Sequence, residues 1–150
     1  MTESLEAWNA PNRMLFGWGA ASELGRHVAD LGAERPFLVT DEGVEAAVEA
    51  GVLDPVRESL SAAGLDYEVW SGVRPDPTDE VVHAAADAYH AAGADFLVGI
   101  GGGSSIDTAK AASILATNDG HVLEFEGSGN VPNPTPPTAY VPTTAGTGSE

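Results

Sequence analysis

The stretch Val98–Ala112, VGIGGGSSIDTAKAA, joins an apolar run to a helical segment through three consecutive glycines. The run at 95–101, DFLVGIG, has the continuous hydrophobic character of a buried parallel strand. Residues from Ser105 to about Thr117 are apolar on nearly every side, which predicts a helix buried between layers. A glycine-rich turn between such elements exposes backbone N–H groups at the positive end of a helix dipole. The stretch therefore predicts a phosphate-binding turn.

Strand-like and helix-like segments alternate along the chain. Apolar or alternating runs predict strands at 12–17, 36–40, 65–72, 95–101 and 138–142. Helical spacing and capping residues predict helices at 19–32, 42–50, from 54 onward, 78–92 and 105–117. Long helices between strands require crossover connections, so the fold class is α/β, with a mainly parallel sheet and helices on both faces. In the helix that Thr78 is predicted to cap, one face carries the apolar residues Val81, Ala85, Ala88 and Ala92.

Three predicted strand ends carry residues suited to a nucleotide, and ligands of such sheets bind at strand carboxyl ends. Asp41 can accept two hydrogen bonds from a ribose diol, or it can simply cap the following helix. Ser104 and Ser105 add hydroxyl groups to the glycine run, which could otherwise be a tight turn without a ligand. The stretch PTTAGTGSE at 142–150 gathers hydroxyls and glycines, or it is an ordinary polar loop.

The glycine run fits neither common nucleotide motif. Ser104 stands where the pattern G-x-G-x-x-G requires a glycine, and no Lys-Ser or Lys-Thr pair follows a glycine as in a P-loop. His83 and His90 lie seven residues apart on a predicted helix, on a face interpreted as solvated. The sequence has no H-x₃-H or H-E-x-x-H pair, so no metal ligand is assigned.

Composition restricts the classes of partner and compartment. The chain has six basic and 23 acidic residues, its formal net charge is −17, and Lys110 is the only lysine. Without a basic stripe, nucleic acid is excluded as a partner. Such acidity predicts a halophilic source, the alternative being an acidic protein from ordinary salt. The absence of cysteine excludes disulfides and thiol catalysis, and the absence of a leader or long apolar run predicts a cytoplasmic protein with no membrane partner.

Two long motifs, GIGGGSSIDTAKAA at 99–112 and PTTAGTGSE at 142–150, resemble the N-terminal signatures of the iron-containing alcohol dehydrogenase family. Shorter segments that are similar to the family follow in the same order: FGWGAASELG, LVTDEG, RPDPT and ATNDG. The resemblance covers almost the whole chain. It implies a Rossmann-like, dehydroquinate-synthase-like N-terminal domain that binds NAD or NADP, which in the family precedes an all-helical domain holding iron or zinc.

The resemblance also implies roles for matching residues. Asp41 would hold the adenosine ribose and favour NAD over NADP. The residues implied at the pyrophosphate are Gly102, Gly103, Ser104 and Ser105, with Asp107 one turn further toward cofactor or substrate. Those implied along the nucleotide cleft are Thr143, Thr144 and Thr147. Asp76, also a cofactor-binding candidate, stands where many family members carry asparagine, and a carboxylate cannot donate the hydrogen bond of an amide.

In the family, hydride moves between an alcohol and NAD while a divalent metal polarises the alcohol oxygen. The family's metal ligands, one aspartate and three histidines, match positions beyond Glu150, so none is assigned here. We therefore expect residues 1–150 to be an incomplete NAD-binding α/β domain that is inactive alone, lacks the helical domain and associates with a second copy or a complementing C-terminal fragment. Its expected substrate is a small alcohol or aldehyde.

Other interpretations of the motifs stay open. A related polyol-phosphate dehydrogenase of the glycerol-1-phosphate type and a dehydroquinate-synthase-like relative share the glycine-rich D-x-x-K segment, and maleylacetate reductases are a further close relative. The string TTAGTGSE favours the alcohol dehydrogenases. The alternative from another class is a non-catalytic remnant that binds nucleotide weakly or serves as an interaction module.

Overall fold

A four-stranded parallel sheet forms the centre of the protein, in the order β2-β1-β3-β4. The computed structural model describes residues 13–47, 51 and 53–149. The strands are β1 (Pro36–Asp41), β2 (Glu68–Val73), β3 (Phe96–Gly101) and β4 (Thr138–Pro142). Each of these corresponds to a strand predicted from the sequence, and the α/β class with a parallel sheet is confirmed.

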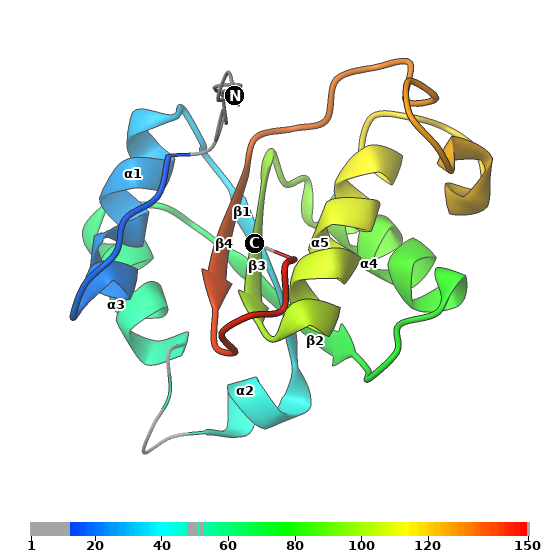
Figure 1. Ribbon diagram of the computed structural model, residues 1–150. Coiled ribbons are helices and arrows are strands. Elements are labelled where there is room, and N and C mark those ends of the chain that lie inside the picture. Colours follow the sequence, from blue (N-terminus) through cyan, green and yellow to red (C-terminus); the bar gives the residue numbers. More distant parts are fainter. Residues whose placement is uncertain (1–12, 48–50, 52, 150) are drawn as a thin grey trace, which may run out of the picture.

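Helices cover both faces of this sheet (Figure 1). The 3₁₀ turn η1 (Ala20–Glu23), α1 (Leu24–Asp30) and α3 (Leu53–Ala62) lie on one face, and α4 (Asp79–Ala92) and α5 (Gly103–Leu115) lie on the other. The connection from β1 to β2 runs in one direction across the sheet, whereas the connections from β2 to β3 and from β3 to β4 run in the other direction. Because crossovers between parallel strands are right-handed, α3 lies on one face of the sheet, and α4 and α5 lie on the other. The short elements are α2 (Glu42–Ala46) and η2 (Val122–Phe125). None of the described helices is long and apolar enough to cross a bilayer.

Alternate side chains of the central strands build two separate cores. Phe37 and Val39 of β1 pack with α4 and α5, whereas Leu38 between them packs with α1 and α3. Val98 and Ile100 of β3 join the second cluster, and all five side chains are fully buried. Because both faces of these strands are covered, their sequences are continuously apolar instead of alternating.

One prediction about local structure is wrong. The predicted strand at 12–17 is absent, because residues 13–17 have no strand conformation and Asn12 lies outside the described residues. A strand needs a neighbouring strand for its backbone hydrogen bonds, and the described sheet places none beside this segment. Phe16 is 99% exposed there.

The predicted face of α4 contributes to the core. Ala85 is fully buried, Ala88 and Ala92 pack against the same core cluster, and Val81 is half-buried. The buried residues of α4 also include Val82, Ala86 and Tyr89, which the sequence prediction did not name. The ring of Tyr89 packs edge-on against Phe37, with 5.9 Å between ring centroids. Helix starts also differ slightly, since α5 begins at Gly103 and α3 at Leu53.

Gly25 allows α1 and α3 to pack in direct backbone contact. A Cβ atom at this position would overlap the carbonyl oxygen of Ser59. The N–H of Gly25 donates to the hydroxyl oxygen of Ser59 at 3.1 Å, and that hydroxyl donates to the carbonyl of Val56 at 2.9 Å. Glycine is therefore required here for space between two helices.

We expect Gly25→Ala to lower the free energy of unfolding by about 1–3 kcal/mol, because overpacking against a backbone outweighs the better helix propensity of alanine. Chemical denaturation measures this change. Arg26→Ala on the same helix is the matched control: its ion pairs with Glu23 and Asp30 are exposed, so the change should stay within about 0.5 kcal/mol. A Gly25→Ala protein as stable as the parent would show that the helices do not pack this closely.

Candidate functional site

A cavity of about 620 Å³ opens at the carboxyl ends of the strands. It is lined by residues that follow each of the four strands: Asp41, Glu42 and Gly43; Ser71 to Pro75; Gly102 to Ser105; and Thr143 and Thr144. Because β2 and β3 lie on opposite sides of β1, the cavity occupies the switch point where α/β sheets bind ligands. Its volume falls within the range of about 300–1,000 Å³ that is usual for small-molecule sites.

Just before the residues that line the cavity, a side-chain hydrogen bond joins β1 to β3. Their ladder runs as far as the pair Val39 and Gly99. One residue further, the hydroxyl of Thr40 donates to the carbonyl of Ile100 at 2.8 Å, and Thr40 is fully buried. A side-chain hydrogen bond thus continues the connection between the strands at the point where the two strand ends diverge.

The glycine run forms the N-terminus of α5. Gly102 is the N-cap residue, and no side chain among the described residues caps the helix there. The N–H groups of Ser105 and Ile106 both donate back to the carbonyl of Gly102, at 3.1 and 3.2 Å. The N–H groups that precede them in the first turn, with the helix dipole behind them, form a site suited to an anion.

The loop after β4 closes against this helix end. A Cβ atom on Gly102 would lie 3.3 Å from the hydroxyl oxygen of Thr144, and one on Gly103 would lie 3.4 Å from the Cβ of Thr147. The N–H of Thr143 donates to the carbonyl of Gly101 at 2.8 Å. Side chains of the loop after β4 therefore approach Gly102 and Gly103 closely, and a larger residue at either position would have to displace them.

Asp41 serves two neighbouring elements at once. Its Oδ1 accepts from the N–H of Val44 at 2.9 Å and caps α2, so the helix-cap interpretation of this residue is confirmed. Its Oδ2 lies 3.3 Å from the hydroxyl oxygen of Ser105, which donates to it. The same carboxylate lines the cavity, so capping α2 leaves it available to a ligand.

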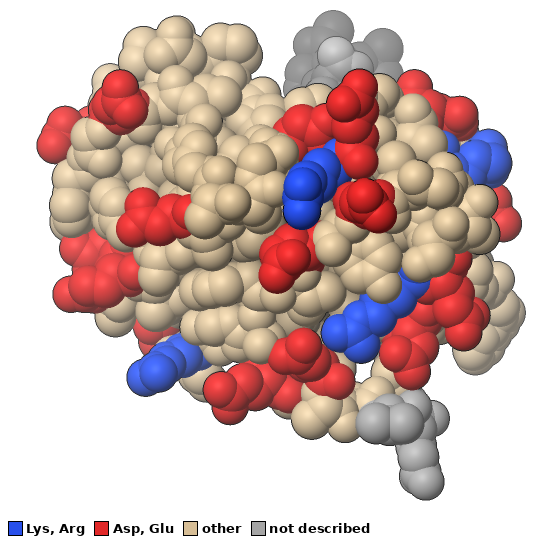
Figure 2. All heavy atoms as spheres, turned by 180° about the vertical axis from the view of Figure 1, so that it is seen from behind, with Lys and Arg blue, Asp and Glu red and all other residues tan. Residues whose placement is uncertain are grey.

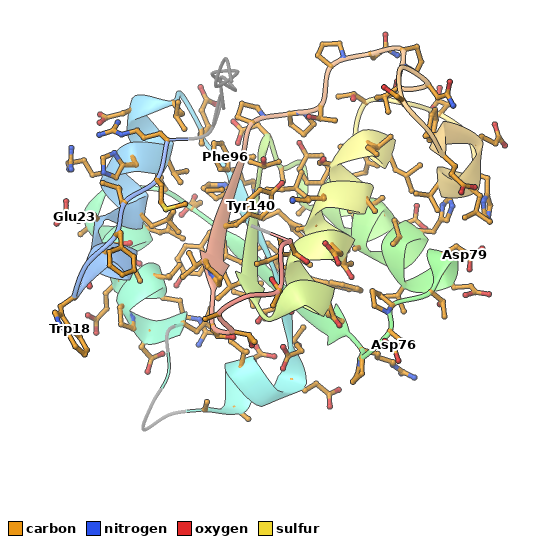
Figure 3. All side chains as sticks on the ribbon, viewed as in Figure 1. Trp18, Glu23, Asp76, Asp79, Phe96 and Tyr140 are labelled. Carbon is orange, nitrogen blue, oxygen red and sulfur yellow. The ribbon has the colours of Figure 1, made fainter. Side chains whose placement is uncertain are left out.

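The predicted site residues fall into two groups. Asp41, Thr143, Thr144 and the residues Gly102 to Ser105 line the cavity together. Thr147 packs behind Gly103 instead, and Asp107 is exposed on α5 outside the lining. Asp76 is also exposed, on the turn that leads from β2 to α4 (Figure 3). Its φ of 52° is left-handed, a conformation that aspartate and asparagine adopt more readily than most residues, so the backbone accounts for its residue type.

Sequence reasoning missed the end of β2. Ser71 to Pro75 line the cavity beside Asp41, which pairs with Gly72 and Val73, and Arg74 is the basic residue of a lining that also holds Asp41 and Glu42. Arg74 forms no ion pair with another described residue, unlike Arg26 and Arg57. The signal was available, because the rule that ligands bind at strand carboxyl ends applies equally to the strand predicted at 65–72.

Lys110 lies on α5 away from the cavity lining. Its ammonium group is 5.3 Å from the centre of the Tyr140 ring, which Figure 3 shows between β4 and α5. Burial raises the pKa of the Tyr140 hydroxyl, so the ring stays neutral and provides a cation–π contact. The lone lysine of this chain therefore has a packing partner.

Two histidines, His83 of α4 and His121 at the start of η2, connect these two elements. His83 is half-buried, not solvated as predicted, and its Nε2 accepts from the N–H of Val122 at 3.3 Å. His121 lies 3.2 Å from the carboxylate of Asp79. Within the described residues, no group of three or more His, Asp or Glu side chains is placed to hold a metal ion. These residues do not fit an iron or zinc site.

Comparison with known proteins identifies the family. The family model described as iron-containing alcohol dehydrogenase matches residues 11–150. The chain belongs to the iron-containing alcohol dehydrogenase family. It is 40% identical over 151 residues to the choline dehydrogenase of Bacillus subtilis (strain 168), a match that covers 99% of this chain and 37% of that protein. The family resemblance of the glycine and threonine motifs is thereby confirmed.

Solved structures of iron-containing alcohol dehydrogenases share the fold. A 1,3-propanediol oxidoreductase superposes with a TM-score of 0.89 at 33% identity, covering 98% of this chain and 38% of that one. The sulfoacetaldehyde reductase of Bifidobacterium kashiwanohense in complex with NAD⁺ superposes with a TM-score of 0.83 at 29% identity, again covering 98% and 38%. This chain thus spans well under half the length of these members of the family, corresponding to their N-terminal α/β domain.

The buried bond of Thr40 provides a test of this connection between β1 and β3. We expect Thr40→Val to lower the free energy of unfolding by about 1–3 kcal/mol, because the Ile100 carbonyl loses its donor without a change in side-chain shape. Thr108→Val is the matched control. Thr108 is also fully buried, but its hydroxyl donates to the Ser104 carbonyl, which the helix ladder also serves. Equal losses for the two variants in chemical denaturation would contradict a special role for Thr40.

Proposed function

We propose that this chain forms the nucleotide-binding part of an NAD-dependent oxidoreductase that acts on a small alcohol or aldehyde. The observation that carries the proposal is the cavity, in which the uncapped N-terminus of α5 and the carboxylate of Asp41 face one space at the switch point of the sheet. Relatives named for choline, propanediol and sulfoacetaldehyde support the substrate class, and the NAD⁺ complex of the sulfoacetaldehyde reductase supports the cofactor.

In this proposal, the cofactor's parts are held by different strand ends. The pyrophosphate accepts hydrogen bonds at the first turn of α5 from Gly102, Gly103 and Ser104, where the helix dipole favours an anion. The ribose diol donates to Asp41. The guanidinium of Arg74 stacks on the adenine, since arginine binds flat aromatic rings through its own plane. When bound, NAD supplies the hydride acceptor of the reaction.

The remaining candidate residues have supporting roles in this proposal. Thr143 and Thr144 form the wall of the cavity on the β4 side, and Thr147 supports the helix end from behind. Asp107, one turn into α5, faces the part of the enzyme that receives the substrate. Asp76 shapes the turn that carries Arg74. The metal of the family has no ligand set among the described residues, so in this proposal alcohol oxidation requires residues other than these.

The charges of the cavity favour NAD over NADP. A 2′-phosphate adds about two negative charges at the position of the ribose, next to Asp41 and Glu42. Arg74 compensates for one of these carboxylates and not for both. The net effect is repulsion, which a free 2′-hydroxyl avoids by donating to Asp41.

Asp41→Asn tests the ribose assignment without removing the helix cap, because an asparagine oxygen still accepts from the N–H of Val44. Calorimetric titrations in molar KCl should show that the parent prefers NAD⁺ over NADP⁺ by about tenfold or more, equivalent to about 1.4 kcal/mol, and that Asp41→Asn reduces this preference to about threefold or less. Asp66→Asn, an exposed change of equal charge outside the cavity, should keep the parental preference. Absence of NAD⁺ binding to the parent at millimolar concentration would overturn the proposed function.

We also propose that the protein is adapted to high salt. On the face seen in Figure 2, carboxylates are widely spread with few basic groups among them, in keeping with the net charge of −17. Raising ionic strength from 0.1 to 1 M shortens the Debye length from about 10 to about 3 Å. Self-repulsion among these carboxylates then no longer opposes the folded state.

The salt dependence of stability tests this adaptation. The free energy of unfolding should rise as KCl increases from about 0.1 to about 2 M, because screening removes carboxylate repulsion. A matched variant with four exposed acids neutralised should show a shallower rise; suitable positions are Glu58, Asp66, Asp119 and Glu126. Stability that is unchanged or lower in molar KCl would refute the adaptation.

A further inference from the structure

Ser105 is a buried serine whose hydroxyl lies next to the proposed ribose ligand. It is 1% exposed, and its Oγ lies 3.3 Å from Oδ2 of Asp41, a residue 64 positions earlier in the chain. Asp41 ends β1 and Ser105 belongs to the first turn after β3. The contact therefore crosses the switch point and links the phosphate turn to the ribose position.

Gly101 makes this contact geometrically feasible. Its φ is +139°, and a Cβ atom there would lie 2.6 Å from the Ser105 hydroxyl oxygen and 3.3 Å from Oδ2 of Asp41. Any side chain at 101 would thus occupy the space between the two groups. Because Gly101 has no side chain, the Ser105 side chain of α5 can reach the Asp41 carboxylate of β1.

Two hydrogen bonds hold the Asp41 carboxylate, one on each oxygen. Val44 donates to Oδ1 from α2, and Ser105 donates to Oδ2 from α5. An ionised carboxylate has about four acceptor positions, so two remain for a ligand. The two hydroxyls of a ribose diol match this remaining capacity, provided that the plane of the carboxylate is held in place.

A serine hydroxyl carries one proton to donate. Because the Ser105 proton is used on Asp41, this hydroxyl cannot at the same time donate to a pyrophosphate oxygen. Ser104, which is half-buried in the cavity lining, is the hydroxyl placed for that role. Adjacent serines of the motif therefore have different partners.

We propose that Ser105 is a positioning residue that orients Asp41 for the ribose diol, and that it thereby strengthens the preference for a cofactor with a free 2′-hydroxyl. This inference rests on the proposed function, in which Asp41 holds the ribose of NAD. It assigns Ser105 to cofactor specificity and Ser104 to phosphate binding.

Ser105→Ala and Ser104→Ala separate these roles when NAD⁺ and NADP⁺ are both titrated calorimetrically in molar KCl. Ser105→Ala should weaken NAD⁺ binding about two- to fivefold, the range of a modest hydrogen bond, and change NADP⁺ binding less than twofold. Ser104→Ala should weaken both cofactors by the same factor, because both carry the pyrophosphate. Ser105→Cys keeps the volume with a weak donor and should follow Ser105→Ala if the alanine protein folds poorly.

A double-mutant cycle with Asp41→Ala tests whether Ser105 acts through the carboxylate. In the Asp41→Ala background, Ser105→Ala should change the affinity for each cofactor less than twofold, because its partner is gone. Parallel loss of NAD⁺ and NADP⁺ binding in Ser105→Ala, or an unchanged NAD⁺/NADP⁺ ratio, overturns the inference while leaving the proposed function intact. A parent that binds neither cofactor overturns the proposed function itself.

Discussion

The separation of β1 and β3 at their carboxyl ends is the constraint on which the site depends. The chain leaves β1 toward β2 and returns to β3 on the other side, so the segments that follow these two strands diverge. Two polar contacts span the gap: Thr40 to the Ile100 carbonyl just before the cavity-lining residues, and Ser105 to Asp41 at the edge of the cavity. The topology opens a space between adjacent strand ends, and these contacts fix the distance across it.

The glycines of the opening motif meet this constraint in different ways. Gly99 lets α5 pack closely on β3, since a Cβ there would be 3.0 Å from the Cβ of Ala109. Gly101 has a positive φ, and its lack of a side chain leaves space for the contact between Ser105 and Asp41. Gly102 and Gly103 admit the threonine loop after β4. One run of small residues thus satisfies strand packing, turn geometry and loop closure, and the anion site at the helix end follows from all three.

Much of this could be predicted from the sequence, because burial on both faces leaves a continuous apolar signature in β1 and β3. Properties that depend on contacts between residues far apart in the sequence could not be predicted in this way. Residues 13–17 have strand-like composition but no neighbouring described strand, and the burial of Tyr89 depends on its contact with Phe37, a residue of another element. The bond between Asp41 and Ser105 requires the relative placement of two strand ends 64 residues apart, which no local pattern contains. The sequence shows Arg74 directly after a predicted strand. Its place in the cavity lining depends on the order of the strands in the sheet, which the sequence pattern alone does not contain.

In the proposed function, the acidity of the chain opposes the binding of an anionic cofactor. A net charge of −17 repels a pyrophosphate at long range, and at low ionic strength that repulsion extends over much of the protein. In the proposal, the groups that attract the pyrophosphate act at contact: the N–H donors at the start of α5 and the dipole of that helix. At 1 M salt the Debye length is about 3 Å, so screening suppresses the long-range repulsion between the acidic surface and the pyrophosphate more than it weakens direct hydrogen bonds. Under the two proposals, molar salt therefore makes an acidic surface compatible with an anionic cofactor, because the short-range contacts of the site dominate binding once the long-range repulsion is screened.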